Sequence, residues 1–278
     1  MKRIIAVILS LLSCTALFTG CGSSESRINV LSREDGSGTR SAFVELLGIE
    51  QDGIDMTTDS AEITNSTSVM ITTVVGNPQA IGYISMGSLS DEVKALQING
   101  TAANARNVKN GSYPISRPFN IATLGEPSEA AQEFIDFILS DIGQTVVEDG
   151  GYIGEGSRGT FETTKPGGKV VVGGSSSVTP IMEKLKEAYL LLNPNAEIDI
   201  QQSDSSTGMT STLDGAYDIG MASRDLKDSE LEAGLVPTTI AMDGIAVIVN
   251  KSNPIESLSA EQIMRIYTGE VAFWDELQ

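Results

Sequence analysis

The chain has 278 residues, of which 40% are hydrophobic and 20% charged, so it suits one two-lobed protein or two small domains with packed cores. It has 18 basic and 37 acidic residues, and the net charge of −19 excludes a protein that binds nucleic acid through a basic surface. It contains no histidine, which excludes Ser-His-Asp and Cys-His catalysis and any histidine-ligated metal site.

The N-terminus is typical of a bacterial export signal. Two basic residues precede an apolar run from Ile4 to Leu12, which is short for a membrane span. The segment from Leu17 to Cys21 resembles a lipobox, so we predict a signal peptide over residues 1–20, a lipid on Cys21 and a tether over residues 21–27. The alternatives are an ordinary secretory signal or a transmembrane helix. A mature chain that keeps only Cys21 has no internal disulfide.

A strand, a glycine-rich loop and a helix follow one another from residue 28. The loop runs Ser32-Arg33-Glu34-Asp35-Gly36-Ser37-Gly38-Thr39-Arg40 and precedes an apolar helical pattern. This geometry directs backbone N–H groups and the helix dipole at an anion, and Arg33 and Arg40 add forked donors. Asp35 suits an anion that carries a proton, since hydrogen phosphate donates to a carboxylate and sulfate does not. A capped glycine-rich turn is the alternative.

The middle of the chain alternates strand and helix signals. Strands are predicted over residues 80–84 and 93–98, and an extended segment over 116–123, where Pro118 disfavours helix for the residue before it. Ser128 is a good N-cap for the helix that follows it. The segment 154–169 is rich in glycine, serine and threonine and is typical of a linker.

The order of strand, polar loop and helix recurs in the second half. Val170–Val172 precede the loop Gly173–Pro180, and the strand Ile198–Ile200 precedes the loop Ser203–Gly208. A further strand over residues 218–222 ends at Ser223-Arg224. Because ligands in open α/β sheets bind beyond the carboxyl ends of strands, these loops predict one small polar ligand.

Nine ordered blocks together resemble the phosphate-binding proteins of bacterial phosphate ABC importers. They are GGSSSVTP, DIGMASR, AMDGIAVIVN, IYTGE, SREDGSGTR, NSTSVM, AIGYIS, YPISRPF and FIDFILSDIGQTVVEDGGYI. The resemblance implies an α/β, two-lobed periplasmic-binding-protein (Venus flytrap) fold with two hinge crossings. In that family GGSSSVTP lies near the start and SREDGSGTR follows the IYTGE block, whereas here SREDGSGTR comes first. We therefore interpret the chain as a circular permutant.

The permutation determines the expected domains. Residues 154–169 join the usual ends of the family, and Ile28 and Gln278 are expected to lie close together. The crossings are Ser116–Thr123 and Ile240–Asn250, the latter an apolar strand pattern interrupted by Asp243-Gly244. One lobe is contiguous and the other discontinuous: residues 119–245, and residues 28–118 plus 246–278.

The resemblance also implies a set of ligand-binding residues. In the discontinuous lobe, Arg33 supplies charge and Asp35 accepts the proton of the ligand. The remaining phosphate contacts are hydroxyls and a backbone N–H, from Ser37, Gly38 and Thr39 in that lobe and Ser176, Ser177 and Ser205 in the other. Arg224 adds a ligand contact or pairs with Asp35. The alternatives are a surface ion pair for Arg33 and helix caps for the serines.

From these observations we expect a monomeric, non-enzymatic lipoprotein, extracytoplasmic and anchored through Cys21 to the outer face of the bacterial cell membrane. It captures inorganic phosphate between two lobes and delivers it to ABC permease subunits. We expect no cofactor, no metal and no nucleic-acid partner. One alternative is a phosphate-sensing or adhesin-like surface protein. Another is a phosphoryl-transfer or hydrolytic enzyme, which needs a nucleophile with a base or a metal cluster.

Overall fold

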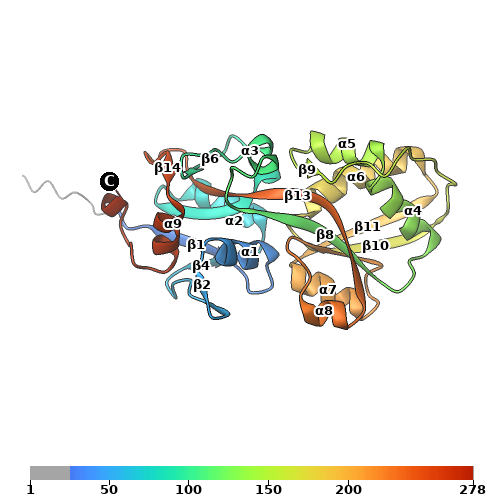
Figure 1. The fold of residues 1–278 in the computed structure, drawn as a ribbon, viewed down its shortest axis with the longest axis horizontal. Helices are drawn as coiled ribbons and strands as arrows, with labels where there is room; N and C mark the ends of the chain where they lie inside the picture. Colours follow the sequence, from blue (N-terminus) through green and yellow to red (C-terminus); the bar gives the residue numbers. More distant parts are fainter. Residues whose placement is uncertain (1–25, 278) are drawn as a thin grey trace, which may run out of the picture.

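A computed structural model describes residues 26–277 of the chain. The predicted signal peptide, Cys21 and most of the tether lie outside the described residues. Two lobes lie side by side and are joined by two long strands (Figure 1). None of the helices within the described part is long and apolar enough to cross a membrane.

The first lobe combines the N-terminal and C-terminal parts of the described chain. Its elements are β1 Asn29–Arg33, α1 Gly38–Leu46, β2 Glu50–Gln51, β3 Ile54–Asp55, β4 Glu62–Thr64, α2 Thr67–Gly76, β5 Ala80–Ser85, η1 Met86–Ser88, β6 Val93–Ala95, β7 Gln97–Ile98, α3 Ala105–Lys109, β14 Ser257–Leu258, α9 Ala260–Tyr267 and η2 Trp274–Leu277. The two ends meet: the Ile28 amide donates to the Ala272 carbonyl at 2.8 Å, and Arg27 forms a bridge with Phe273. Ile28 therefore lies beside residues 272–273, while Gln278, the other end named in the prediction, lies outside the described residues.

The second lobe is built from the middle of the chain. Its elements are α4 Glu129–Ile138, α5 Asp141–Asp149, β9 Ile153–Gly154, β10 Gly168–Ser175, α6 Thr179–Leu192, β11 Ala196–Ser203, α7 Ser205–Leu213, β12 Ile219–Ala222 and α8 Asp228–Glu232. Ser128 caps α4 as predicted, since its side chain accepts from the Ala131 amide.

The strands β8 Ser116–Leu124 and β13 Leu235–Asn250 run between the lobes (Figure 1). One sheet has the order β11-β10-β12-β8-β13-β5-β1-β4, with β6 and β9 also paired to β13. β13 pairs with β8 over Leu235–Gly244 and with β5 over Ile245–Val249, so a single strand carries the sheet from one lobe into the other. Both segments predicted as crossings lie on these strands, and β13 continues through Asp243-Gly244 without ending.

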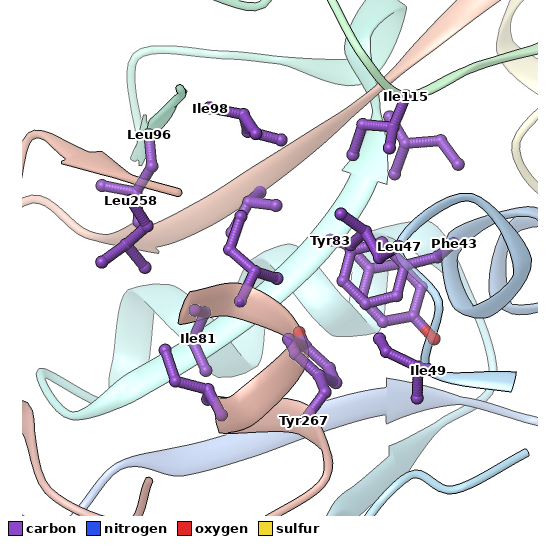
Figure 2. Close-up of a cluster of buried hydrophobic side chains, with 14 of the residues drawn as sticks. Phe43, Leu47, Ile49, Ile81, Tyr83, Leu96, Ile98, Ile115, Leu258 and Tyr267 are labelled. Atoms are coloured by element: carbon purple, nitrogen blue, oxygen red, sulfur yellow. The ribbon is translucent and has the colours of Figure 1, made fainter. Parts of the chain in front are cut away.

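The core of the first lobe holds the loop after β1 in place. Phe43 of α1 stacks on Tyr83 of β5 at 3.9 Å between ring centroids, with Tyr267 of α9 on its edge at 4.7 Å (Figure 2). The Tyr83 hydroxyl shares a 2.9 Å hydrogen bond with Ser32 and accepts from the Arg33 amide at 3.1 Å. Burial raises the pKa of Tyr83 to about 12, so the hydroxyl stays protonated. The core therefore fixes where the Arg33 side chain leaves the sheet.

The core of the second lobe lies between α4, α5, α6 and the β10 side of the sheet. It is formed by aromatic and aliphatic side chains that include Phe119, Phe134, Phe137, Ile181 and Tyr189. Each lobe thus has its own buried cluster, and the strands β8 and β13 join the two.

The segment predicted as a linker is fastened to the second lobe. Phe161 packs against Phe137 of α4 at 5.2 Å between ring centroids. The Glu133 carboxylate accepts from the Thr164 amide at 2.6 Å and from the Thr163 hydroxyl at 2.9 Å. Its other oxygen accepts from the Tyr189 hydroxyl at 2.7 Å. Burial alone raises the pKa of Glu133, but these hydrogen bonds bring it below its ordinary value.

Removing this carboxylate is expected to destabilise the second lobe. Glu133→Ala leaves several donors without a partner and should reduce the free energy of unfolding by about 2 kcal/mol or more. Because the folded pKa of Glu133 is lowered, the stabilisation is present above its unfolded pKa and is lost as the pH falls through the folded pKa. Denaturant unfolding at pH 7 measures the loss, with Asp136→Asn on the exposed side of α4 as control. Equal stability of the two variants would contradict the role of Glu133.

Candidate functional site

Four helix N-termini point toward the boundary between the lobes. Ser37 caps α1 and Ser66 caps α2 in the first lobe. In the second lobe Asp204 caps α7, and the loop Ser175–Val178 precedes α6. Hydrogen bonds across this boundary bring the four helix starts together. A helix N-terminus carries free N–H groups and partial positive charge, so this arrangement suits an anion.

Five buried side chains form what we call the interlobe cluster: Arg33, Thr39, Thr67, Ser176 and Ser177. Thr39 and Ser177 share a 2.8 Å hydrogen bond between their hydroxyls. The Thr67 hydroxyl lies 3.4 Å from that of Ser176 and 3.3 Å from that of Ser177. Arg33, Thr39 and Thr67 come from the first lobe and the two serines from the second. The cluster therefore forms only when the lobes are closed on each other.

Arg33 is the charged member of the cluster and is 1% exposed. Its Nη2 donates to the Ser176 hydroxyl at 3.0 Å, and its Nε and Nη2 donate to the Glu34 carboxylate at 2.8 and 2.7 Å. The Nη1 atom is buried and has no partner among the described residues. A buried donor without a partner is costly, and a bound anion is the partner it suits best. This buried position agrees with the expectation that Arg33 supplies the positive charge of the site.

Asp35 does not join the cluster. Its side chain is 98% exposed and pairs with Arg40 at 2.5 Å. Arg40 also donates to Asp55 at 2.7 Å and to the Arg33 carbonyl at 3.0 Å, so it holds the outer side of the loop. Its carboxylate is turned toward solvent, so this structure does not bring Asp35 to the cluster, where the prediction has it accept a proton from the ligand. The carboxylate that does lie beside Arg33 belongs to Glu34.

Gly38 lies at the boundary between the two lobes, close to side chains of the second lobe. A Cβ placed on it would lie 2.5 Å from the Ser205 hydroxyl and 2.9 Å from the Ser223 hydroxyl. The Ser206 amide also donates to the Gly36 carbonyl across the boundary at 3.2 Å. The structure thus brings Gly38 and Ser205 together as predicted, while Ser37 is buried as the cap of α1.

Arg224 is buried, and both terminal nitrogens of its guanidinium already have hydrogen-bond partners. Its two terminal nitrogens donate to the Glu230 carboxylate at 2.9 and 2.7 Å, and Nη2 lies 3.3 Å from the Ser206 hydroxyl. Its Nε is buried without a partner among the described residues. Within the described residues its guanidinium bonds to neither Asp35 nor the interlobe cluster, and its charged partner is Glu230.

The predicted set of ligand-binding residues leaves out Thr67, Glu34 and Ser223. Thr67 follows the strand β4 and opens α2, which is the same order of strand, polar loop and helix that identified Ser176. The Ser223 hydroxyl accepts from Ser175 at 2.9 Å and lies 3.5 Å from that of Ser205. It therefore orders the loops around the cluster.

A second buried charge pair lies on the crossing strands. Arg117 of β8 donates to Asp243 of β13 at 3.3 Å, with exposed side-chain fractions of 2% and 0%. The Ser85 hydroxyl donates to the other Asp243 oxygen at 3.0 Å. Burial raises the pKa of Asp243 to about 6, and burial together with the charge of Arg33 lowers the pKa of Arg117 to about 10. Within residues 26–277 no group of His, Cys, Asp or Glu is arranged to hold a metal.

Comparison with known proteins agrees with this architecture. A family model described as a PBP superfamily domain matches residues 16–141 and 159–278. Because the match covers most of the chain, the protein belongs to the PBP superfamily. The superfamily match and the observed lobes confirm the predicted mixed α/β, two-lobed fold, whereas the circular permutation stays a prediction.

Individual relatives are more specific. The chain is 51% identical over 285 residues to the phosphate-binding protein PstS 2 of Streptococcus agalactiae, covering 97% of both chains. It is also similar to a solved phosphate-binding protein of a phosphate ABC transporter from Streptococcus pneumoniae, with 44% identity, a TM-score of 0.72 and coverage of 91% of this chain and 100% of that one. A match to PstS of Bacillus subtilis, 36% identical, spans 135 residues, or 48% of this chain and 43% of the relative. The chain is thus PstS-like.

Proposed function

We propose that the protein is an extracytoplasmic solute-binding protein that captures inorganic phosphate between its lobes and delivers it to an ABC permease. The observation that carries the proposal is the interlobe cluster, in which Arg33 and hydroxyls from both lobes converge in a buried site. The names of the similar streptococcal proteins support phosphate as the ligand.

The mechanism is a shift of a hinge equilibrium. A tetrahedral anion that replaces the hydroxyl-to-hydroxyl contacts would accept from Thr39 and Thr67 on one side and from Ser176 and Ser177 on the other. It contacts both halves only when the lobes are closed, so binding favours closure. Arg33 supplies the compensating charge, and helix N-termini supply further donors. The net charge of −19 does not oppose this, because exposed charges more than about 8 Å away are largely screened at physiological salt.

We also propose that the mature protein is a monomeric lipoprotein held at the outer face of the membrane by a lipid on Cys21, and that it binds without catalysing a reaction. The circular permutation remains part of this proposal, with lobes at residues 119–245 and at 28–118 plus 246–278. Two findings support it: the pairing of Arg27 with Phe273, and the Bacillus subtilis match that spans only about half of each chain. The Streptococcus agalactiae relative, matched over 97% of both chains, shares the order found here.

Calorimetry of the mature, delipidated protein with phosphate and sulfate tests the main proposal. We expect saturable, one-to-one binding of phosphate. Failure to bind any oxyanion would favour the adhesin-like alternative, and turnover of a phosphomonoester would favour the enzyme. Light scattering on the same sample tests the monomer.

Lobe closure provides a separate prediction at Gly38. Gly38→Ala places a methyl group against the hydroxyls of Ser205 and Ser223, at distances that atoms do not tolerate. The lobes fold, but they close less fully, so phosphate affinity should fall at least about tenfold, which corresponds to about 1.4 kcal/mol. Calorimetry measures the affinity and thermal unfolding checks the fold. Gly48→Ala is the control, because it adds the same methyl group just after α1, where no atom lies within 4 Å of it. Its φ of +66° means that this substitution costs some stability. Unchanged affinity of Gly38→Ala would show that the lobes do not need this contact.

A further inference from the structure

A groove of about 490 Å³ lies between the lobes beside α1. Its first-lobe wall is formed by α1, from Ser41 to Leu46, and its floor includes Arg117 of β8. The opposite wall is the segment Arg224–Lys227 of the second lobe. The volume is within the range of about 300–1,000 Å³ that is typical of small-molecule sites. None of the five members of the interlobe cluster lines this groove.

Arg224 lies between the groove and the start of α1. Its Cγ atom would be 3.1 Å from a Cβ on Gly38, the residue next to Thr39 of the cluster. The same Cβ would contact Ser205 and Ser223, so the Arg224 side chain stands beside the hydroxyls that surround the anion site. Arg224 therefore lines the groove and also lies beside the start of α1, close to the Ser205 and Ser223 hydroxyls.

The position of Arg224 is fixed from several sides. Its guanidinium makes a two-pronged ion pair with Glu230, with side-chain exposures of 7% and 11%. Glu230 also accepts from the Lys227 amide at 2.8 Å, and the Arg224 carbonyl accepts from Asn120 of β8 at 3.0 Å. Two parallel charge-assisted hydrogen bonds define the direction of an arginine more strictly than a single contact. Displacing this side chain would break the pair inside the protein, where an unpaired charge is costly.

We propose that Arg224, held by Glu230, determines specificity by closing the groove off from the anion site, so that the site accepts a bare oxyanion and rejects phosphate monoesters. The inference rests on the proposed function. An ester carries an organic group on one of its oxygens, and that group needs space next to the anion. The groove has this space, but the Arg224 side chain separates it from the cluster. Shortening the side chain therefore joins the two spaces.

Calorimetry with inorganic phosphate and glycerol 3-phosphate tests this role. The variant combines Arg224→Ala with Glu230→Gln, so that no buried carboxylate is left unpaired. The matched control combines Arg224→Met with Glu230→Gln, which removes the charge but keeps most of the volume. We expect the ratio of ester affinity to phosphate affinity to rise at least tenfold in the alanine variant and to stay near the wild-type ratio in the methionine variant. Thermal unfolding checks that both are folded.

Several results would overturn the proposal. One is an unchanged ratio in the folded alanine variant, and another is an equal rise in the methionine variant, which would assign the effect to charge. Loss of phosphate binding without a gain for the ester would make Arg224 a ligand contact. If the alanine variant does not fold, the wild-type affinities provide the test. The proposal requires the wild-type protein to bind phosphate at least a hundredfold more tightly than glycerol 3-phosphate, and a smaller ratio would contradict it. Absence of phosphate binding in the wild type would instead contradict the proposed function itself.

Discussion

Replacing Arg33 with alanine is expected to reduce phosphate affinity at least about a hundredfold, since charge-assisted hydrogen bonds are worth about 1.5–3 kcal/mol each. Arg33 is buried, its Nη1 is free to donate, and its Nη2 already reaches Ser176 in the opposite lobe. The substitution has a second cost, because the Glu34 carboxylate stays beside the cluster without its cation and repels the anion. Calorimetry at pH 7 measures the loss.

Arg40→Ala is the matched control for Arg33. Arg40 lies in the first turn of α1 and pairs with Asp35 and Asp55 on the outer side of the loop. Its side chain contacts no side chain of the interlobe cluster, so the affinity should change no more than about fivefold, which corresponds to about 1 kcal/mol. An Arg40→Ala variant that loses more affinity than Arg33→Ala would reverse the assignment of the charged ligand contact.

The predicted site residues that the structure brings into the interlobe cluster share one property. Thr39, Ser176 and Ser177 lie where a predicted strand and its polar loop lead into a helix, and a parallel sheet brings such loops to one edge. Their positions depend on secondary structure that is encoded within about ten residues. Thr67 has the same local order and was open to the same prediction, but a threonine at a helix start is equally typical of a simple cap.

The position of Asp35 depends on residues that are distant in the sequence. Neighbouring loop residues turn to different sides, and the sequence does not say which of Glu34 and Asp35 faces the site. Arg40 determines which way Asp35 faces, because it pairs with Asp35. Asp55, twenty positions after Asp35, holds Arg40 on the outer side of the loop. A contact of this kind is tertiary, and no local pattern indicates it.

The linker and the hinge show the same limit. A polar, glycine-rich composition predicts flexibility over residues 154–169, yet Phe161 and the contacts to Glu133 fasten the segment to α4. Asp243-Gly244 interrupts an apolar pattern, which is a common sign that a strand ends. Here the strand continues, because Asp243 finds a buried partner in Arg117 on the neighbouring strand.

Replacing Arg117 with methionine is expected to reduce the free energy of unfolding by about 3–5 kcal/mol at pH 8, because removing one partner of a buried ion pair leaves an uncompensated charge. Asp243 is 0% exposed and would keep only Ser85 and the Gly87 amide as hydrogen-bond donors. Methionine preserves the apolar contact with Phe119, over which the Arg117 guanidinium lies at 5.4 Å. The decrease in the free energy of unfolding therefore measures the effect of the unpaired Asp243 charge and not that of a cavity.

The pH dependence identifies Asp243 as the cause. Burial already raises the pKa of Asp243 to about 6 with Arg117 present, and loss of the arginine raises it further. For an acid whose folded pKa exceeds its unfolded value, the destabilisation is fully present above the folded pKa. It is relieved as the pH falls through that value toward the unfolded pKa. The deficit of Arg117→Met relative to wild type should therefore shrink between pH 8 and pH 5.

Comparison at each pH separates Asp243 from the other acids. The pKa values of Asp55, Glu133 and Glu230 are lowered in the fold, so these groups lose stabilisation as the pH falls. Wild type and variant share this loss, and it cancels in the difference. Tyr113 and Tyr152, which also lie near Asp243, have raised pKa values and stay neutral over this range.

Denaturant unfolding at pH 8 and pH 5 provides the measurement, and the double variant Arg117→Met with Asp243→Asn is its control. Without either charge the double variant should recover most of the lost stability, because replacing both members of a buried pair is often neutral. A deficit that is equal at both pH values, or a double variant as unstable as the single one, would contradict this account. Since β8 and β13 are the strands that join the lobes, the charge of Asp243 lies at the hinge that the proposed function requires.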